Sequence, residues 1–86
     1  MIIVVCRSGV TSSFYASKLN KKHNEKIAKG MSIYDFMNIM KQLKKGDMVL
    51  VTPQVYSEFK ELCEEEVEAL CSYDYIPETS FKTLII

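Results

Sequence analysis

The sequence predicts an α/β fold, an open four-stranded parallel sheet with helices on both faces. Short apolar runs alternate with longer segments whose apolar residues recur at helical spacing, which is typical of such a sheet. The first run, residues 2–5, holds only isoleucine and valine, as expected for a strand buried on both faces. With 86 residues, the chain is expected to form one domain over residues 1–86.

The first half of the chain is predicted to hold two strands and two helices. Residues 2–5 form the first strand, and the segment from Cys6 to Ser13, rich in Ser, Thr and Gly, forms a loop. A helix is expected over residues 13–24, followed by a short edge strand from Glu25 to Ala28. A second helix begins after the capping residue Ser32 and ends at Gly46. Its apolar face consists of Ile33, Phe36, Met37, Met40 and Leu43.

The second half is predicted to continue the alternation. The apolar run from Met48 to Val51 forms a strand that Thr52-Pro53 ends. Val67 to Cys71 is expected to be a buried strand, with Glu64-Glu65-Glu66 before it as a solvated loop and helix end. From Pro77 a last short helix is expected, although residues 81–86 also suit a strand. Between the two expected strands, a third helix is marked by Val55, Phe59, Leu62 and Cys63.

The composition excludes several classes of protein. Eleven basic residues balance eleven acidic ones, so no net field attracts nucleic acid or an anionic membrane. The apolar runs are far shorter than the roughly 20 residues that cross a bilayer, and the N-terminus lacks the basic region of a signal peptide. Three unpaired cysteines and one histidine form neither a disulfide framework nor a metal site. We therefore expect a cytoplasmic protein with no cofactor, no metal and no insertion into the membrane.

The segment after the first strand is the candidate functional site. A loop that leaves a strand and enters a helix presents unpaired backbone N–H groups, which bind anions such as phosphate. Gly9 allows a positive φ or a close approach to a ligand. The same field favours the thiolate of Cys6, which lies at the carboxyl end of the strand, where parallel sheets bind ligands. The predicted site is therefore a reactive cysteine, Cys6, beside a phosphate-binding loop made of Arg7, Ser8, Gly9, Val10, Thr11, Ser12 and Ser13.

Plainer interpretations compete with this one. A lone cysteine is commonly a small buried residue, and hydroxyl-rich loops commonly cap helices. Arg7 is equally well explained as solvated surface. The position of Cys6 at the end of a strand favours a function for Cys6 itself.

Two better-known phosphate sites do not fit the segment. A Walker loop ends in Gly-Lys-Ser/Thr, which is missing here. A cysteine phosphatase of the Cys-x5-Arg type needs an arginine six residues after the nucleophile, and that position is Ser12. Without that arginine, hydrolysis is expected to be slow and a phosphocysteine to persist, as a carrier requires.

These residues resemble the enzyme IIB component of the sugar phosphotransferase system, in its lactose/chitobiose (cellobiose) class. That family carries Cys-x-x-Gly-Met-Ser-Thr-Ser, an apolar pair and Ser-Lys. The chain follows this pattern with Cys6, Gly9, Val10, Thr11, Ser12, Ser13, Phe14-Tyr15 and Ser17-Lys18. A second match is Val51-Thr52-Pro53-Gln54-Val55, which is similar to the family's Gly-Pro-Gln-(Ile/Val) segment. The chain departs from the family at Val10, usually methionine, and at Arg7, usually a small residue.

The resemblance implies a phosphotransferase component that acts as a phosphoryl carrier. Cys6 would accept a phosphoryl group from a histidine of a IIA partner and pass it to a sugar held in the membrane-embedded IIC partner. The backbone amides from Arg7 to Ser13 would hold the phosphate, with Gln54 and Tyr75 as rim contacts.

Two other functions stay open. One is a IIB-like sensor of phosphorylation state that docks on a regulator. The other is a small cysteine phosphatase or arsenate reductase with Asp74 as general acid, which Ser12 and the lack of a second nearby cysteine disfavour. His23 is expected to be solvated, roughly 15 Å from Cys6 along the first helix. Cys63 and Cys71 are expected to belong to the core.

Overall fold

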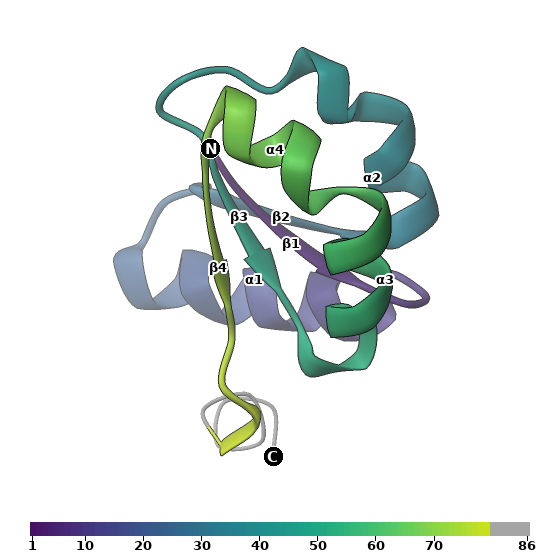
Figure 1. Ribbon diagram of the computed structural model, residues 1–86. Coiled ribbons are helices and arrows are strands. Elements are labelled where there is room, and N and C mark those ends of the chain that lie inside the picture. The colour runs from purple at the N-terminus through teal and green to yellow at the C-terminus, as the bar shows by residue number, and fades with distance from the viewer. Residues whose placement is uncertain (80–86) are drawn as a thin grey trace.

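The computed structural model describes residues 1–79, which form a four-stranded sheet in the order β2-β1-β3-β4. All neighbouring strands pair in parallel, with Cys6 opposite Ser32 and Val5 opposite Val51. The sheet confirms the predicted fold class (Figure 1). Its strands are β1 (Ile2–Cys6), β2 (Ala28–Ser32), β3 (Met48–Val51) and β4 (Ser72–Tyr75).

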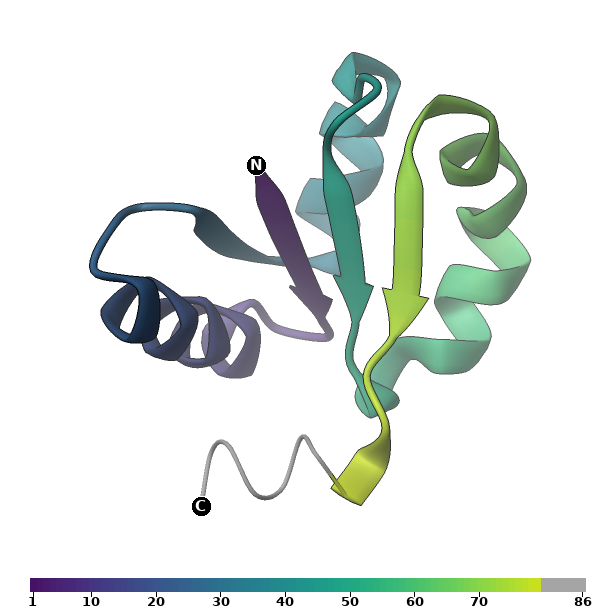
Figure 2. The same ribbon diagram turned by 90° about the vertical axis from the view of Figure 1, so that its left-hand side faces the viewer.

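Helices cover both faces of this sheet. Helix α1 lies against one face, and α2, α3 and α4 lie against the other (Figures 1 and 2). The α-helices are α1 (Val10–His23), α2 (Ile33–Ile39), α3 (Tyr56–Leu62) and α4 (Glu64–Leu70). Two short 3-10 helices, η1 (Met40–Gln42) and η2 (Pro53–Val55), follow α2 and precede α3.

The alternation of side chains along β1 divides the core between the two faces. Ile3 and Val5 belong to the larger cluster under α2, α3 and α4, where Phe36 and Phe59 are fully buried. Val4 points to the other face, where it packs with four residues of a smaller cluster. These four are Tyr15, Ala16, Ala28 and Ile76. The all-apolar composition of residues 2–5 is thus explained by burial on both sides.

The predicted edge strand from Glu25 to Ala28 was placed too early. Strand β2 starts at Ala28, because the Asn20 side chain binds the backbone just before it. Asn20 Oδ1 accepts the N–H groups of Ile27 and Ala28, each at 2.8 Å, and its Nδ2 donates to the Ala28 carbonyl at 3.0 Å. These bonds make residues 24–27 a turn. The sequence of β2, Ala-Lys-Gly-Met-Ser, has no β-branched run that would have revealed it.

The predicted buried strand from Val67 to Cys71 was wrong, because Val67 lies in helix α4. Phe59, Cys63 and Val67 are four residues apart and fully or almost fully buried, so they share one face. The N–H groups of Cys63 and Val67 donate to the carbonyls four residues earlier at 2.8 and 2.9 Å. Glu64-Glu65-Glu66 therefore form the first turn of α4, where carboxylates suit the helix dipole. The fourth strand follows as β4.

Smaller boundary differences affect two helices. Helix α1 begins at Val10, three residues before the prediction, so the loop after β1 is only residues 7–9. The cap at Ser32 is present, since its Oγ accepts the Asp35 N–H at 3.1 Å. Helix α2 nevertheless ends before Gly46, which has φ +106° in the turn leading to β3. The predicted structure of residues 81–86 lies outside the described residues.

Candidate functional site

The site lies where the chain changes direction across the sheet. From β1 the chain passes through α1 to β2 on one side, and from β2 it crosses to β3 on the other. The carboxyl ends of β1 and β3 therefore form the switch point at which open parallel sheets bind ligands. Cys6 is the last residue of β1, and Thr52 directly follows β3.

Thr52 joins these two strand ends, a role that the sequence did not indicate. It is fully buried, and both its N–H and its Oγ1 hydroxyl donate to the Val5 carbonyl, at 3.1 and 2.9 Å. These two hydrogen bonds to the carbonyl of Val5, the residue before Cys6, fix the segment containing Gln54 against the end of β1.

The Cys6 thiol is enclosed by the start of α1. Its Sγ accepts the N–H groups of Gly9 at 3.0 Å and Ser12 at 3.2 Å, and its S–H donates to Ser12 Oγ at 3.0 Å. Cys6 has no exposed surface. Two of the predicted backbone amides, those of Gly9 and Ser12, are therefore directed at the sulfur, whereas the N–H groups of Val10 and Ser13 donate to Ser8 Oγ and the Gly9 carbonyl. The sulfur lies beneath the loop instead of at an open mouth.

Two glycines allow this arrangement. Gly9 has φ +89°, which suits glycine, and a Cβ there would lie 3.1 Å from the Ser32 nitrogen. A Cβ on Gly30 of β2 would lie 2.3 Å from backbone atoms of both Ser12 and Ser13. Gly30 thus lets the first turn of α1 lie directly on β2. Sequence reasoning missed Gly30, and a glycine within a polar strand was the one available signal.

The hydroxyl groups of the loop and first turn mainly hold the turn together. Ser12 Oγ lies 3.0 Å from the Met31 carbonyl and 3.2 Å from the Gly9 carbonyl, and Ser12 is fully buried. Ser13 Oγ donates to the Gly9 carbonyl at 2.6 Å. Ser8 Oγ accepts the Val10 N–H at 3.4 Å. Of the other predicted residues, Thr11 is half-buried and Val10 is 74% exposed.

Arg7 turns away from the sulfur. Its guanidinium donates to the backbone carbonyl of Gln54 at 2.7 Å and to the carboxylate of Glu58 at 3.2 Å. The side chains of Arg7 and Glu58 are both largely exposed. Arg7 thereby links the loop after β1 to η2 and α3, which lie about fifty residues later in the sequence.

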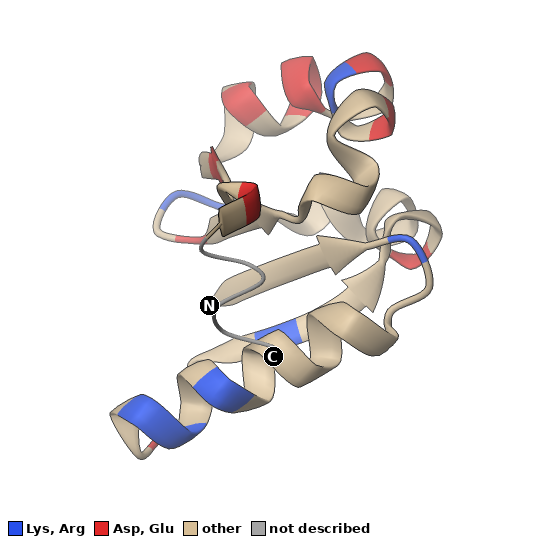
Figure 3. Cartoon of the chain, turned by 90° about the horizontal axis from the view of Figure 1, so that it is seen from below, with Lys and Arg blue, Asp and Glu red and all other residues tan. Residues whose placement is uncertain are grey.

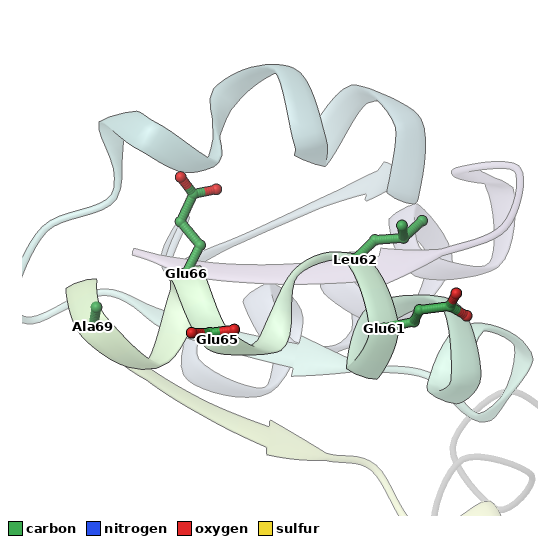
Figure 4. A pocket seen from close by; sticks show the side chains of 5 residues that line it. All are labelled: Glu61, Leu62, Glu65, Glu66 and Ala69. Carbon is green, nitrogen blue, oxygen red and sulfur yellow. The ribbon is translucent and has the colours of Figure 1, made fainter.

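An open pocket of about 390 Å³ beside this link is lined by Arg7, Ser8 and Gln54. A second pocket, of about 440 Å³, lies on α3 and α4 and is lined by Glu61, Leu62, Glu65, Glu66 and Ala69 (Figure 4). Acidic residues gather on α3 and α4, whereas α1 carries basic residues (Figure 3). Carboxylates repel a phosphoryl group, so the pocket beside Arg7 is the better site for an anion.

Tyr75, the other predicted rim residue, lies at the end of β4. Its ring packs edge-on against those of Tyr56, Phe59 and Tyr73, with centroids 5.3, 5.9 and 5.9 Å away. Its hydroxyl donates to the Glu64 carboxylate. Burial is the main cause that raises the pKa of Tyr75, and the contact with Glu64 raises it further. The structure thus brings Gln54, but not Tyr75, to the pocket beside the loop.

The remaining cysteines differ from Cys6 in their surroundings. Cys63 is 2% exposed and packs in the larger core cluster, and Cys71 is half-buried beside it. Burial raises the pKa of both thiols, with Glu66 adding to the effect at Cys63. Within residues 1–79, no group of three or more His, Cys, Asp or Glu side chains is arranged to hold a metal ion.

Fold and site together define a class: a small open-sheet α/β protein whose cysteine is held by backbone amides at the switch point of the sheet. Residues 1–80 match the family model for the lactose/cellobiose-specific IIB subunit of the PTS system, and the chain belongs to this family. Comparisons with curated proteins and with solved structures gave no match.

Membership of this family gives the general function of the chain. It is a phosphotransferase component of a sugar-transporting phosphotransferase system, with a phosphoryl-carrier role alongside IIA and IIC partners. Among the described residues, no helix has the length and apolar character needed to span a membrane.

Proposed function

We propose that Cys6 accepts a phosphoryl group from a phosphohistidine of the IIA partner and passes it to a sugar bound in the IIC partner. The observation that carries the proposal is the pair of N–H groups, from Gly9 and Ser12, that converge on Cys6 Sγ. Backbone donors of this kind stabilise a thiolate and, after transfer, the oxygens of a phosphoryl group. The cytoplasm, where both partners present their reacting groups, is the proposed location.

Both transfers balance without a cofactor. In the first, Sγ attacks phosphorus, an S–P bond forms and the N–P bond breaks, and the proton of the thiol ends on the departing imidazole nitrogen. In the second, a sugar hydroxyl oxygen attacks phosphorus, an O–P bond forms and the S–P bond breaks, and the proton of the hydroxyl ends on Sγ, which returns the thiol. The protein contributes position and charge stabilisation, which are the main contributions in phosphoryl transfer.

Two features favour a carrier over a phosphatase. Ser12 occupies the position where a phosphatase loop needs arginine, and its hydroxyl is committed to Cys6 and the Met31 carbonyl. Arg7, the nearest cation in the sequence, is held by Gln54 and Glu58. Without a guanidinium on the phosphoryl group, water is a poor acceptor, so the phosphocysteine should persist until a sugar arrives.

A reconstituted transfer assay tests the proposal. Membrane vesicles that contain the IIC partner are supplied with phosphoenolpyruvate, the general phosphotransfer proteins, the IIA partner and this chain. Sugar phosphate should form with the wild type and with the control Cys71→Ser, and should not form with Cys6→Ser. Undiminished sugar phosphate with Cys6→Ser would contradict the proposal.

The two alternatives give different results. A sensor of phosphorylation state would become phosphorylated on Cys6 yet support no formation of sugar phosphate with a IIC partner. A phosphatase would turn over p-nitrophenyl phosphate alone, and Cys6→Ala would abolish that turnover.

A further inference from the structure

The cover over Cys6 raises the question of access. Attack in line requires the two reacting atoms to approach within about 3–3.5 Å. Cys6 has no exposed surface, and its sulfur is enclosed by Gly9 and Ser12. A phosphohistidine on another protein therefore cannot reach Sγ until the loop of residues 7–9 moves away together with the start of α1, where Ser12 lies.

The side chain of Arg7 holds that loop in place from outside. Its guanidinium binds the Gln54 carbonyl at 2.7 Å and Glu58 Oε1 at 3.2 Å, so it joins the loop to a segment that Thr52 fixes to the sheet. The side chains of Arg7 and Glu58 are 65% and 43% exposed, so a partner can reach both.

We propose that Arg7 is a latch: its bonds to Gln54 and Glu58 keep the loop closed over Cys6 and set how often the thiol becomes accessible. A partner that engages either Arg7 or Glu58 would release the loop. The consequence for phosphoryl transfer rests on the proposed function, whereas the latch itself is a property of this chain and is tested without any phosphoryl donor.

Cysteine alkylation measures the latch directly. The protein is treated with iodoacetamide across a range of pH kept below about 10, where the fold is intact, and the rate at each cysteine is followed by peptide mass spectrometry. The rate at high pH reports how often Cys6 is accessible, and the midpoint of the profile reports its ionisation. A variant that changes only the local charge moves the midpoint, whereas a released latch raises the high-pH rate.

Three variants are compared with the wild type. Arg7→Ala and Glu58→Gln each remove one side of the contact, and Glu61→Gln is the control on the same helix, where Glu61 lines the acidic pocket instead. Because the contacts are exposed, each release should raise the high-pH rate at Cys6 by about three- to tenfold. Glu61→Gln should leave the rate unchanged. Raised salt should increase the rate in the wild type but not in Glu58→Gln.

Cys63 serves as the internal reference, because it is 2% exposed in the core and reacts only when the core opens. Its rate should stay constant in all variants. An unchanged rate at Cys6 in Arg7→Ala and Glu58→Gln would overturn the latch, and so would a parallel rise at Cys63, which would show that the whole fold had loosened. Failure to phosphorylate Cys6 would instead count against the proposed function.

Discussion

Ser12 contacts both the candidate reactive cysteine and the neighbouring strand. Its N–H and hydroxyl contact Cys6 Sγ, and its hydroxyl also reaches the Met31 carbonyl on β2. Sequence reasoning predicted Cys6 and its loop as the candidate site because a cysteine, a glycine and hydroxyl residues follow an apolar run. It could not show that the thiol is covered, because the residue pattern does not give the conformation in which Gly9 and Ser12 fold over the sulfur. Nor could it show that Arg7 binds Gln54 and Glu58, because these residues are distant from Arg7 in the sequence.

Removing the Ser12 hydroxyl should affect both stability and chemistry. Ser12→Ala leaves buried groups without their partner, so the free energy of unfolding should fall by about 1–3 kcal/mol, measured by urea denaturation. Phosphorylation of Cys6 should also slow. The control Ser13→Ala removes an exposed hydroxyl bonded to the Gly9 carbonyl and should cost less than about 1 kcal/mol. Equal effects of the two changes would contradict the assignment.

At the scale of elements, apolar periodicity predicted β1, β3 and α3 but not β2 or α4. Strand β2 is an edge strand of polar and small residues, and the contacts that place it come from Asn20 and Gly30. In α4, a short apolar segment suited a strand and a helix equally, and only its packing against the face of Phe59 and Cys63 decides between them. Local patterns cannot supply such tertiary contacts.

The contact between α1 and β2 is tested by Gly30→Ala. The new Cβ would lie 2.3 Å from helix backbone atoms, so α1 must shift and unfolding should become easier by about 1–3 kcal/mol. Because the shift moves the Ser12 N–H, phosphorylation of Cys6 should slow as well. In the control Gly46→Ala, the new Cβ has no neighbouring atom within 4 Å, and φ is +106°. Only the backbone strain is therefore expected to lower the free energy of unfolding, by about 1 kcal/mol. A larger loss with Gly46→Ala, or unchanged phosphorylation with Gly30→Ala, would refute the assigned role.

The aromatic cluster between β4 and α3 should make the protein sensitive to alkali. Burial raises the pKa values of Tyr56, Tyr73 and Tyr75 above the ordinary 10.0, and nearby carboxylates raise them further. A raised pKa in the folded state gives stability that is fully present below about pH 10 and is lost as the pH rises through the folded values. Unfolding should therefore accompany tyrosinate absorbance as the pH is raised above 10.

The phenylalanine variants isolate one contribution to this loss. Tyr75→Phe removes the hydroxyl bound to Glu64 and should flatten the loss of stability in alkali. Tyr34→Phe changes a side chain that is 70% exposed and should leave the profile unchanged. If tyrosinate forms well before unfolding begins in Tyr34→Phe, which lacks the exposed tyrosine, the raised pKa values are refuted.

At the scale of the whole molecule, the site is made by topology. Residues 6–9 and 52–58 meet because β1 and β3 are neighbours, although β2 intervenes in the sequence. The family resemblance implied Gln54 as a rim contact of the loop after Cys6, and the two segments do follow apolar runs that become adjacent strands. The balance of eleven basic and eleven acidic residues did not reveal that charge is separated, with acidic groups on α3 and α4 and basic groups on α1 (Figure 3).

The central claim is that Cys6 carries the phosphoryl group. The most direct test incubates the chain with phosphoenolpyruvate, the general phosphotransfer proteins and a IIA partner, then measures the intact mass and maps the modified residue. We predict a gain of one phosphoryl group on Cys6, stable in acid as a thiophosphate is, absent in Cys6→Ser and retained in Cys71→Ser. A phosphoryl group on His23, or a gain that persists in Cys6→Ser, would contradict the account.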